Sequence, residues 1–302
     1  MAHHPYRVAV FARNEASNIA QTLDSIRAAV TDGRALEIRV LINGCTDDTA
    51  QVVQAYADQH EGIVGIELPV GDKCNAWNAY LHQHAQPWLG DEDIHFFMDG
   101  DVGASLQALP KMRRLLMDHP QAYAVAGAPM NGRHRKSLTQ LMIDRRWIYG
   151  GLYAVRGSQL ARMREANIRL PLGLCGNDHM ISRLLKTNFP NINDIDEMRI
   201  LPQSESGYTF RPLMPWRLED WQLYRKRRVT YALRHEQLLR IGEQRLDQLP
   251  ATMDTVNQAI FADLQTRKLN RWSAVAQVRK RLARLYPNFE TAHYTRMLQR
   301  AA

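Results

Sequence analysis

Short runs of consecutive apolar residues alternate with amphipathic segments through the first hundred residues of the chain. The apolar runs are Arg7–Ala12, Glu37–Asn43 and Ile94–Asp99. Strands that are buried on both faces give such near-continuous runs, whereas half-exposed strands alternate between apolar and polar residues. A shorter run at Gly62–Pro69 predicts one further strand.

The segments between these runs carry apolar residues at helical spacing. In residues 17–30 the apolar positions recur every three or four residues, and Ser17 is predicted to cap the helix start. Residues 46–60 and 74–85 repeat the pattern. Strands that alternate with helices predict an α/β fold, in which a parallel sheet is covered by helices on both faces.

The end of the chain has a different pattern and predicts three amphipathic helices, over residues 252–268, 272–286 and 289–302. The middle helix has an apolar stripe, and basic residues crowd the rest of its surface. The stripe consists of Val275, Val278, Leu282 and Leu285. We expect this stripe to pack on the preceding domain or on a second subunit of a homodimer. Peripheral contact with an anionic membrane is the alternative.

Charge divides the chain at nearly the same place. The formal net charge is +8, and from Arg211 onward 18 Lys and Arg stand against 8 Asp and Glu. We therefore expect an α/β domain over residues 1–230 and a basic helical extension over residues 231–302. The basic segment shows no helix-turn-helix, zinc or aromatic-basic strand motif, so a nucleic-acid partner is not expected.

The cysteines and the apolar segments bear on the compartment. Three widely spaced cysteines make neither a disulfide framework nor a zinc pattern. No run approaches the roughly 18 apolar residues of a spanning helix, and no apolar leader follows Met1. The sequence predicts a cytoplasmic protein, and any contact with the inner face of a membrane would be peripheral.

Two carboxylates close the third apolar run, in Asp99-Gly100-Asp101. Ligands of open α/β sheets bind beyond the carboxyl ends of the strands. Residues i and i+2 of an extended strand end point the same way, so both carboxylates could face one Mg²⁺ or Mn²⁺ ion. The alternative is one capping aspartate followed by one turn aspartate.

Six segments in a fixed order resemble the family 2 glycosyltransferases. They are Val8–Ile26, Val40–Val53, Gly71–Leu81, Phe96–Val102, Gly150–Leu160 and Leu174–Lys186. The resemblance covers residues 7–230. It implies the GT-A fold, a Rossmann-like, mixed and mainly parallel sheet flanked by helices, here followed by a C-terminal helical segment.

The resemblance also implies an activity. It is the inverting, metal-dependent transfer of a sugar from a nucleoside-diphosphate sugar, with UDP as the expected carrier, to a hydroxyl of a glycan, a lipid or a small metabolite. A sugar nucleotidyltransferase is an alternative, but its Gly-rich phosphate loop is missing after the first strand, which ends in Ala12-Arg13-Asn14-Glu15. A catalytically degenerate basic scaffold that binds nucleic acid or membrane is another.

Residue roles follow from the same resemblance. Asp178 would be the general base, and the adjacent His179 is a second candidate. Asp101 would hold Mn²⁺ or Mg²⁺, with Asp99 bound to the ion through water or to the ribose. The residues implied to contact the nucleotide are Asn14, Glu15, Asn43, Asp47, Lys73, Asp99 and Arg228. The chain departs from the family pattern at Ile42-Asn43, where two aspartates are usual, and at Asn177, where glutamate is usual.

Overall fold

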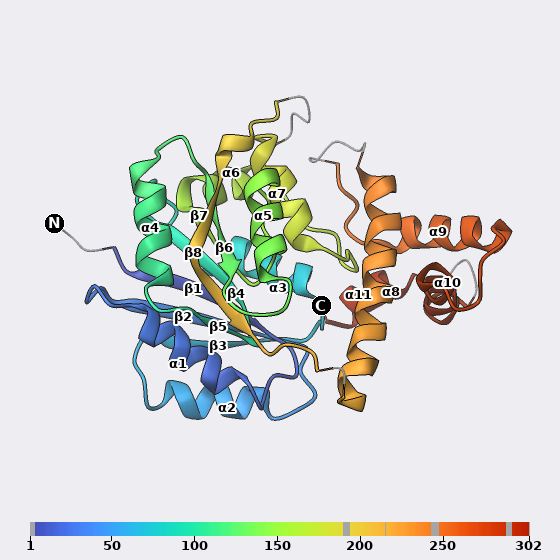
Figure 1. Cartoon of the computed structure of the whole chain (residues 1–302), viewed down its shortest axis with the longest axis horizontal. Helices are drawn as coiled ribbons and strands as arrows, with labels where there is room; N and C mark the ends of the chain where they lie inside the picture. Colours follow the sequence, from blue (N-terminus) through green and yellow to red (C-terminus); the bar gives the residue numbers. More distant parts are fainter. Residues whose placement is uncertain (1–3, 190–193, 215, 243–247, 288–291, 302) are drawn as a thin grey trace.

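The computed structural model describes residues 4–189, 194–214, 216–242, 248–287 and 292–301. Its described strands form one mixed sheet in the order β3-β2-β1-β4-β7-β6-β8-β5 (Figure 1). The strands are β1 (Tyr6–Ala12), β2 (Leu36–Asn43), β3 (Ile63–Leu68), β4 (Ile94–Asp99), β5 (Val102–Ala104), β6 (Ala124–Pro129), β7 (Leu152–Arg156) and β8 (Ile200–Phe210).

Helices cover both faces of this sheet. Those of the α/β region are α1 (Ile19–Ala29), α2 (Thr49–Ala57), α3 (Lys73–Ala79), α4 (Ala108–Asp118), α5 (Arg135–Arg145), α6 (Gly157–Glu165) and α7 (Asn177–Lys186). Those that follow are α8 (Leu218–Ile241), α9 (Asp254–Thr266), α10 (Ala274–Leu285) and α11 (His293–Ala301). A π-helical turn (Tyr80–His84) extends α3, and a 3-10 turn (Glu197–Arg199) precedes β8.

The four strands expected from the apolar runs are β1 to β4, and the prediction of parallel pairing among β1, β2, β3 and β4 is confirmed. The rest of the sheet is mixed, because β7 runs antiparallel to both β4 and β6. The prediction of Ser17 as a cap is wrong. Helix α1 begins at Ile19, and the carbonyl of Glu15 accepts the N–H groups of Asn18 and Ile19, both at 2.9 Å.

Alternate residues of the central strands face two separate hydrophobic clusters. On β1, Val8 and Val10 pack with α1, α2 and α4, whereas Ala9 and Phe11 pack with α3, α5, α6 and α7. Both sides of β1 are therefore buried, which explains its unbroken apolar run. Ile42 belongs to the cluster of α1 and α2 and is buried.

Helices α8 to α11 lie together on one side of the α/β region (Figure 1, orange to red). The apolar stripe of α10 packs here within its own chain: Val278 and Leu282 are fully buried with Leu233 of α8 and Ile260 of α9. Of the last predicted helix, residues 289–291 lie outside the described residues. Helix α8 runs without a break through residue 230, where we placed the domain boundary.

None of the described helices combines the length and the apolar character that crossing a membrane requires.

Candidate active site at the carboxyl edge of the sheet

The ends of β1, β2 and β4 bring polar residues to one edge of the sheet. In the parallel ladder Phe11 of β1 lies opposite Asp99 of β4, so the residues after β1 lie beside Asp99 and Asp101. Gly100 donates its N–H to the Phe11 carbonyl at 2.8 Å. A Cβ on Gly100 would lie 3.0 Å from that oxygen, and this close approach excludes a side chain.

Asp99 forms an ion pair with Lys73, the first residue of α3, and both side chains are partly buried. Burial raises the pKa of Asp99, although the Lys73 ammonium opposes the rise, and the negative charges of Asp101 and Asp178 raise the pKa further. Burial alone would lower the pKa of Lys73, but Asp99, and then Asp178 and Asp101, raise it above its usual value. Lys73 therefore stays positively charged among these carboxylates.

Glu15 belongs to the same electrostatic group. Burial raises the pKa of Glu15, a hydrogen bond from the Asn18 amide at 2.7 Å lowers it, and the charges of Asp101 and Asp99 raise it again. We call Glu15, Lys73, Asp99, Asp101 and Asp178 the carboxyl-edge site. Four carboxylates stand there against one ammonium group, so the site favours an added cation.

Asp178 lies in the first turn of α7, where the helix dipole favours a negative charge. Its Oδ1 atom is 3.9 Å from Nη1 of Arg234 on α8, and its side chain is 16% exposed. The helix starts after Gly176, which has a φ of 94°. A Cβ on Gly176 would lie 2.6 Å from Cδ of Arg234, so the glycine is what lets α8 approach this turn.

His179, the second candidate for the base, has different surroundings. Its ring lies against Trp147, with 3.9 Å between the ring centroids. Burial and the positive charges of Arg234, Arg183 and Lys186 lower the pKa of His179 to about 4. These three cations oppose the imidazolium that a histidine base would form. Asp178 instead shares the carboxyl-edge site with Lys73 and Asp99, so the surroundings favour Asp178.

Three of the residues expected at the nucleotide hold the loops of this edge together. The side-chain oxygen of Asn43, which is buried, accepts the N–H of Asp72 at 2.9 Å. Asn14 accepts the N–H of Thr46 at 2.8 Å, and Asp47 accepts the N–H of Ala16 at 3.2 Å.

The hydroxyl of Thr49 bonds to Asp47 and is the main reason why the pKa of that carboxyl lies below its usual value. These bonds order the loops that follow β1 and β2, so the exposed surface around them is preorganised.

Arg228 lies away from the stripe of α8 that faces Asp178. It is exposed on α8, six residues before Arg234 and therefore about 120° around the helix. Arg227, seven residues before Arg234, lies on the same stripe of α8 as Arg234. Arg234 is the arginine of α8 that contacts Asp178, and a contact of Arg228 with the nucleotide stays a prediction.

Asp72 and Gln237 are further residues that the sequence reasoning missed. Asp72 caps α3 by accepting the N–H groups of Cys74 (2.9 Å) and Asn75 (3.1 Å), and its other oxygen accepts the N–H of Gly173 at 2.9 Å. An aspartate just before a helical pattern is a recognised cap signal, so this cap could have been predicted. Its bond to Gly173, 101 residues away, could not.

Gln237 connects α8 to the turn before Asp178. It accepts the N–H of Cys175 at 2.8 Å and donates to the carbonyl of Gly173 at 3.0 Å and to Asn257 of α9 at 2.9 Å. The side chain of Gln237 is fully buried. The C-terminal helices therefore take part in positioning the turn that carries Asp178.

The carboxylates of this edge suit a divalent cation that is shared with a ligand. In the described part of the chain, no group of three or more His, Cys, Asp and Glu is arranged to hold an ion by itself. Mg²⁺ and Mn²⁺ are often bound through one or two carboxylates plus the phosphates of a substrate. Asp101, which is exposed, and Asp99 fit that arrangement.

The profile of glycosyl transferase family 2 matches residues 7–172 of the chain, and no curated protein matches it. Mannosyltransferase PcManGT from Pyrobaculum calidifontis, in complex with GDP-Man and Mn²⁺, is 18% identical, with a TM-score of 0.61, over 99% of this chain and 85% of its own.

S. aureus TarS 1-349, in complex with UDP-GlcNAc, is 14% identical, with a TM-score of 0.52, over 96% of this chain and 75% of its own. Both proteins resemble this chain in fold, and the shared fold is the GT-A fold. The family profile covers more than half of the chain and includes β1 to β4, α3 and β7. The protein therefore belongs to glycosyl transferase family 2 and is a glycosyltransferase.

Proposed function

We propose that the protein transfers a sugar from a nucleoside-diphosphate sugar to an acceptor hydroxyl, with inversion at the anomeric carbon and with Mn²⁺ or Mg²⁺ on the diphosphate. The observation that carries the proposal is the grouping of Asp99, Lys73 and Asp178. They come from three separate elements: Lys73 and Asp99 form an ion pair, and the charge of Asp178 acts on the pKa values of both. The similar structures hold GDP-Man and UDP-GlcNAc, which supports a nucleotide-sugar donor.

On the donor side, Asp101 and Asp99 would hold the divalent cation, and Lys73 would face the diphosphate as a second positive charge. The cation would supply Lewis-acid stabilisation of the charge that develops on the departing diphosphate. Glu15, at the end of β1, would lie toward the nucleoside. Ile42 is buried in the core, so recognition of the base falls to the neighbouring loops of residues 13–16 and 44–48.

On the acceptor side, Asp178 would accept the proton of the attacking hydroxyl. The acceptor oxygen then bonds to the anomeric carbon as the bond from that carbon to the diphosphate oxygen breaks, and the nucleoside diphosphate leaves. A positioned general base contributes roughly 10²- to 10⁴-fold to such a step. Arg234, 3.9 Å from Asp178, would orient the carboxylate.

The acceptor would be a glycan, a lipid-linked sugar or a small metabolite. Trp216, Leu218, Trp221 and Tyr224 at the start of α8 are all more than half exposed. Exposed aromatic residues beside arginines suit either sugar rings or the headgroup region of a membrane. Peripheral membrane contact would therefore use the start of α8 and not the buried stripe of α10. Vesicle sedimentation of Trp216→Ala with Trp221→Ala tests this, and loss of binding to anionic vesicles is expected.

The donor site is tested by thermal unfolding with UDP, GDP, CDP and dTDP, each with Mn²⁺ or with EDTA. A ligand at a hundred times its dissociation constant stabilises a protein by about 2.7 kcal/mol. For a chain of this length, that raises the melting temperature by about 5 °C. We expect a shift for UDP that needs Mn²⁺ and is lost in Asp101→Asn. Glu61→Gln, at an exposed carboxylate on the loop before β3, is the matched control and keeps the shift.

If GDP is the one nucleotide of the four that gives a Mn²⁺-dependent shift, the proposed reaction stands and the nucleotide carrier is GDP, not UDP. No metal-dependent shift for any of the four nucleotides would overturn the donor site.

A further inference from the structure

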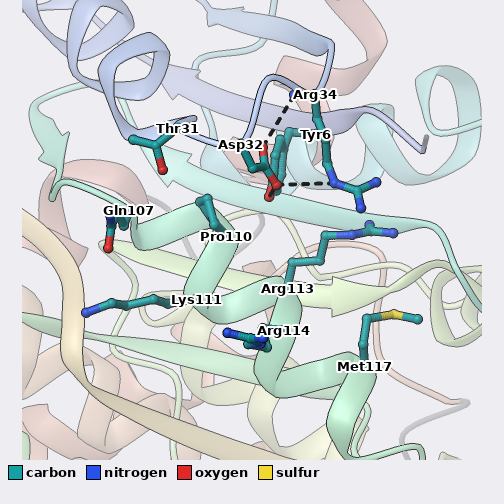
Figure 2. A pocket seen from close by; sticks show the side chains of 10 residues that line it. All are labelled: Tyr6, Thr31, Asp32, Arg34, Gln107, Pro110, Lys111, Arg113, Arg114 and Met117. Carbon is teal, nitrogen blue, oxygen red and sulfur yellow. Dashed lines mark hydrogen bonds and ion pairs between the residues drawn. The ribbon is translucent and has the colours of Figure 1, made fainter.

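A cavity lies at the amino end of strand β1, at the opposite edge of the sheet from the candidate active site. Its volume is about 530 Å³, and it is formed by the loop after α1, the first residue of β1 and one face of α4. Figure 2 shows the loop of residues 31–34 above α4. We call this cavity the amino-edge pocket, and its polar lining includes Tyr6, Asp32, Arg34, Lys111, Arg113 and Arg114.

The lining of the amino-edge pocket is strongly basic. Four cationic side chains stand against one carboxylate, Asp32. That carboxylate is already engaged, because it accepts the hydroxyl of Tyr6 at 2.7 Å and Nε of Arg34 at 3.2 Å. Arg34 and Arg113 extend their guanidinium groups toward the same end of the pocket (Figure 2). The pocket thus presents a positive field that the protein leaves largely unbalanced.

Arg113 is the residue for which this imbalance matters most. It is 8% exposed, and the bond found for its guanidinium in the described residues is a long one, 3.4 Å from Nη1 to the Glu92 carbonyl. Burial and the positive charge of Arg34 lower its pKa. The remaining guanidinium N–H groups of Arg113 are not buried, so they open into the pocket and can donate to an ion or to water.

Arg156 provides a matched comparison in the same region. It is 7% exposed, and its guanidinium donates to the carbonyls of Ala122, Asp91, Leu116 and His119 at 2.7–3.3 Å. Two of those carbonyls belong to the end of α4 or follow it. Arg156 is a structural arginine whose donors are used by the protein. Arg113 lies on α4 itself, and most of its N–H donors are not used by the protein, so they can bind a ligand.

The amino-edge pocket is separate from the carboxyl-edge site. Tyr6 begins β1, and the ladder places Phe11, five residues later, opposite Asp99. Five residues of an extended strand span about 16 Å. A ligand in the pocket would therefore occupy the opposite edge of the sheet from a bound donor.

We propose that the amino-edge pocket binds a small phosphorylated compound, whose phosphate lies between Arg34 and Arg113. Guanidinium groups recognise phosphate oxygens through paired, parallel hydrogen bonds. Lys111 and Arg114 on α4 add positive charge along the helix. The volume is within the range of small-molecule sites and accommodates one or two phosphates with a sugar-sized group. The phosphate could belong to a free metabolite or to a lipid headgroup.

Calorimetric titration with sodium pyrophosphate tests the proposal. EDTA is included, so that no divalent cation can hold the probe at the carboxyl-edge site. We expect one saturable site and at least tenfold weaker binding in Arg113→Gln. The double variant Lys111→Gln/Arg114→Gln changes partly or fully exposed positions that folding does not need, and it should weaken binding severalfold.

The control is Lys280→Gln/Arg284→Gln, which removes two charges from another basic cavity, between α8 and α10. Pyrophosphate binding should be unchanged in this control. Absence of saturable binding, or equal weakening in control and pocket variants, would overturn the proposal in favour of unspecific attraction to a basic protein. Neither result depends on whether the protein turns over a nucleotide sugar.

Sedimentation with phosphatidic acid vesicles separates the two sources of the phosphate. Vesicle binding that Lys111→Gln/Arg114→Gln abolishes would identify a headgroup. Pyrophosphate binding without such vesicle binding would identify a free compound.

Discussion

The two ends of strand β1 differ in charge and in how that charge is balanced. At the carboxyl end, Glu15 joins Asp99, Asp101 and Asp178 around a single ammonium group, that of Lys73. At the amino end, Tyr6 adjoins a pocket in which Arg34 pairs with Asp32 and Arg113 makes one long bond, so the positive charge is only partly balanced. One edge favours an added cation and the other an added anion.

The difference arises from the elements that supply each edge. The loop after β1, the end of β4 and the first turn of α7 provide the carboxylates, whereas the loop after α1 and the surface of α4 provide the arginines. The sheet keeps the two groups of charges apart across its strands. A diphosphate could therefore bind at either edge, but it would need a metal only at the carboxyl edge.

The largest expected effect comes from Asp178→Asn. Transfer should fall by about 10³-fold, because the amide cannot accept the acceptor's proton. UDP binding with Mn²⁺ should change less than threefold, since the donor side is intact. Single-turnover transfer and thermal shift measure the two quantities. Transfer that persists within tenfold of the wild type would remove Asp178 from the role of base.

The arginine comparison makes a prediction about stability. Arg156→Gln should lower the free energy of unfolding by about 3 kcal/mol, because several buried carbonyls lose a charged donor. Arg113→Gln should change it by less than about 1 kcal/mol, because one long bond is lost and the repulsion from Arg34 is relieved. Urea unfolding of both variants measures the difference. Equal losses would mean that Arg113 is as well satisfied as Arg156.

Lys73→Gln should change cation and anion binding in opposite directions. Removal of the ammonium leaves the carboxylates of the carboxyl-edge site without a counter-charge, so Mn²⁺ alone should bind several times more tightly. UDP should bind about tenfold more weakly, because the diphosphate loses a positive partner. Calorimetric titration with Mn²⁺ alone, and with UDP in the presence of saturating Mn²⁺, distinguishes this from general damage, which would weaken both.

The smallest effect concerns pH. Burial and neighbouring carboxylates raise the pKa values of Asp99 and Glu15, so their protons are lost at higher pH than in the unfolded chain. The folded state therefore loses stability relative to the unfolded chain as pH rises through these pKa values. A bound cation offsets this loss. The thermal shift produced by Mn²⁺ should be larger at pH 7.5 than at pH 5 by a few degrees. A shift that does not depend on pH would argue against carboxylate ligands.

Much of the first half of the sheet could be predicted from the chain. Strands β1 and β4, and most of β2, are buried on both faces, so their apolar runs are long and end at polar residues such as Asp99. Strand β3 lies at the edge of the sheet and is mostly exposed, and its run is shorter. Strand β6, Ala124–Pro129, is rich in small residues, and β8 is interrupted by two exposed polar residues, Ser204 and Glu205, so neither gives a comparable signal. These strands depend on their pairing partners.

The candidate site could be predicted where a residue follows a recognisable strand or motif, as with Asp99, Asp101 and Asp178. The contact of Arg234 with Asp178 depends on how α8 packs against α7, and helix periodicity alone could not select it from the other arginines. The same holds for Arg113, which appears in the sequence as one of several basic residues on a helix. Its burial depends on the loop of residues 31–34.

Asp72 has a consequence for motion within the molecule. Its side chain joins the start of α3, which carries Lys73, to Gly173, five residues before Asp178. The groups that would face the leaving diphosphate and the attacking hydroxyl are thus held by one carboxylate. Their fluctuations should be correlated, and the backbone amides of Cys74 and Gly173 should exchange with deuterium at similar rates. Loss of Asp72 would let the two parts fluctuate independently, and their alignment would then vary from one encounter with substrate to the next.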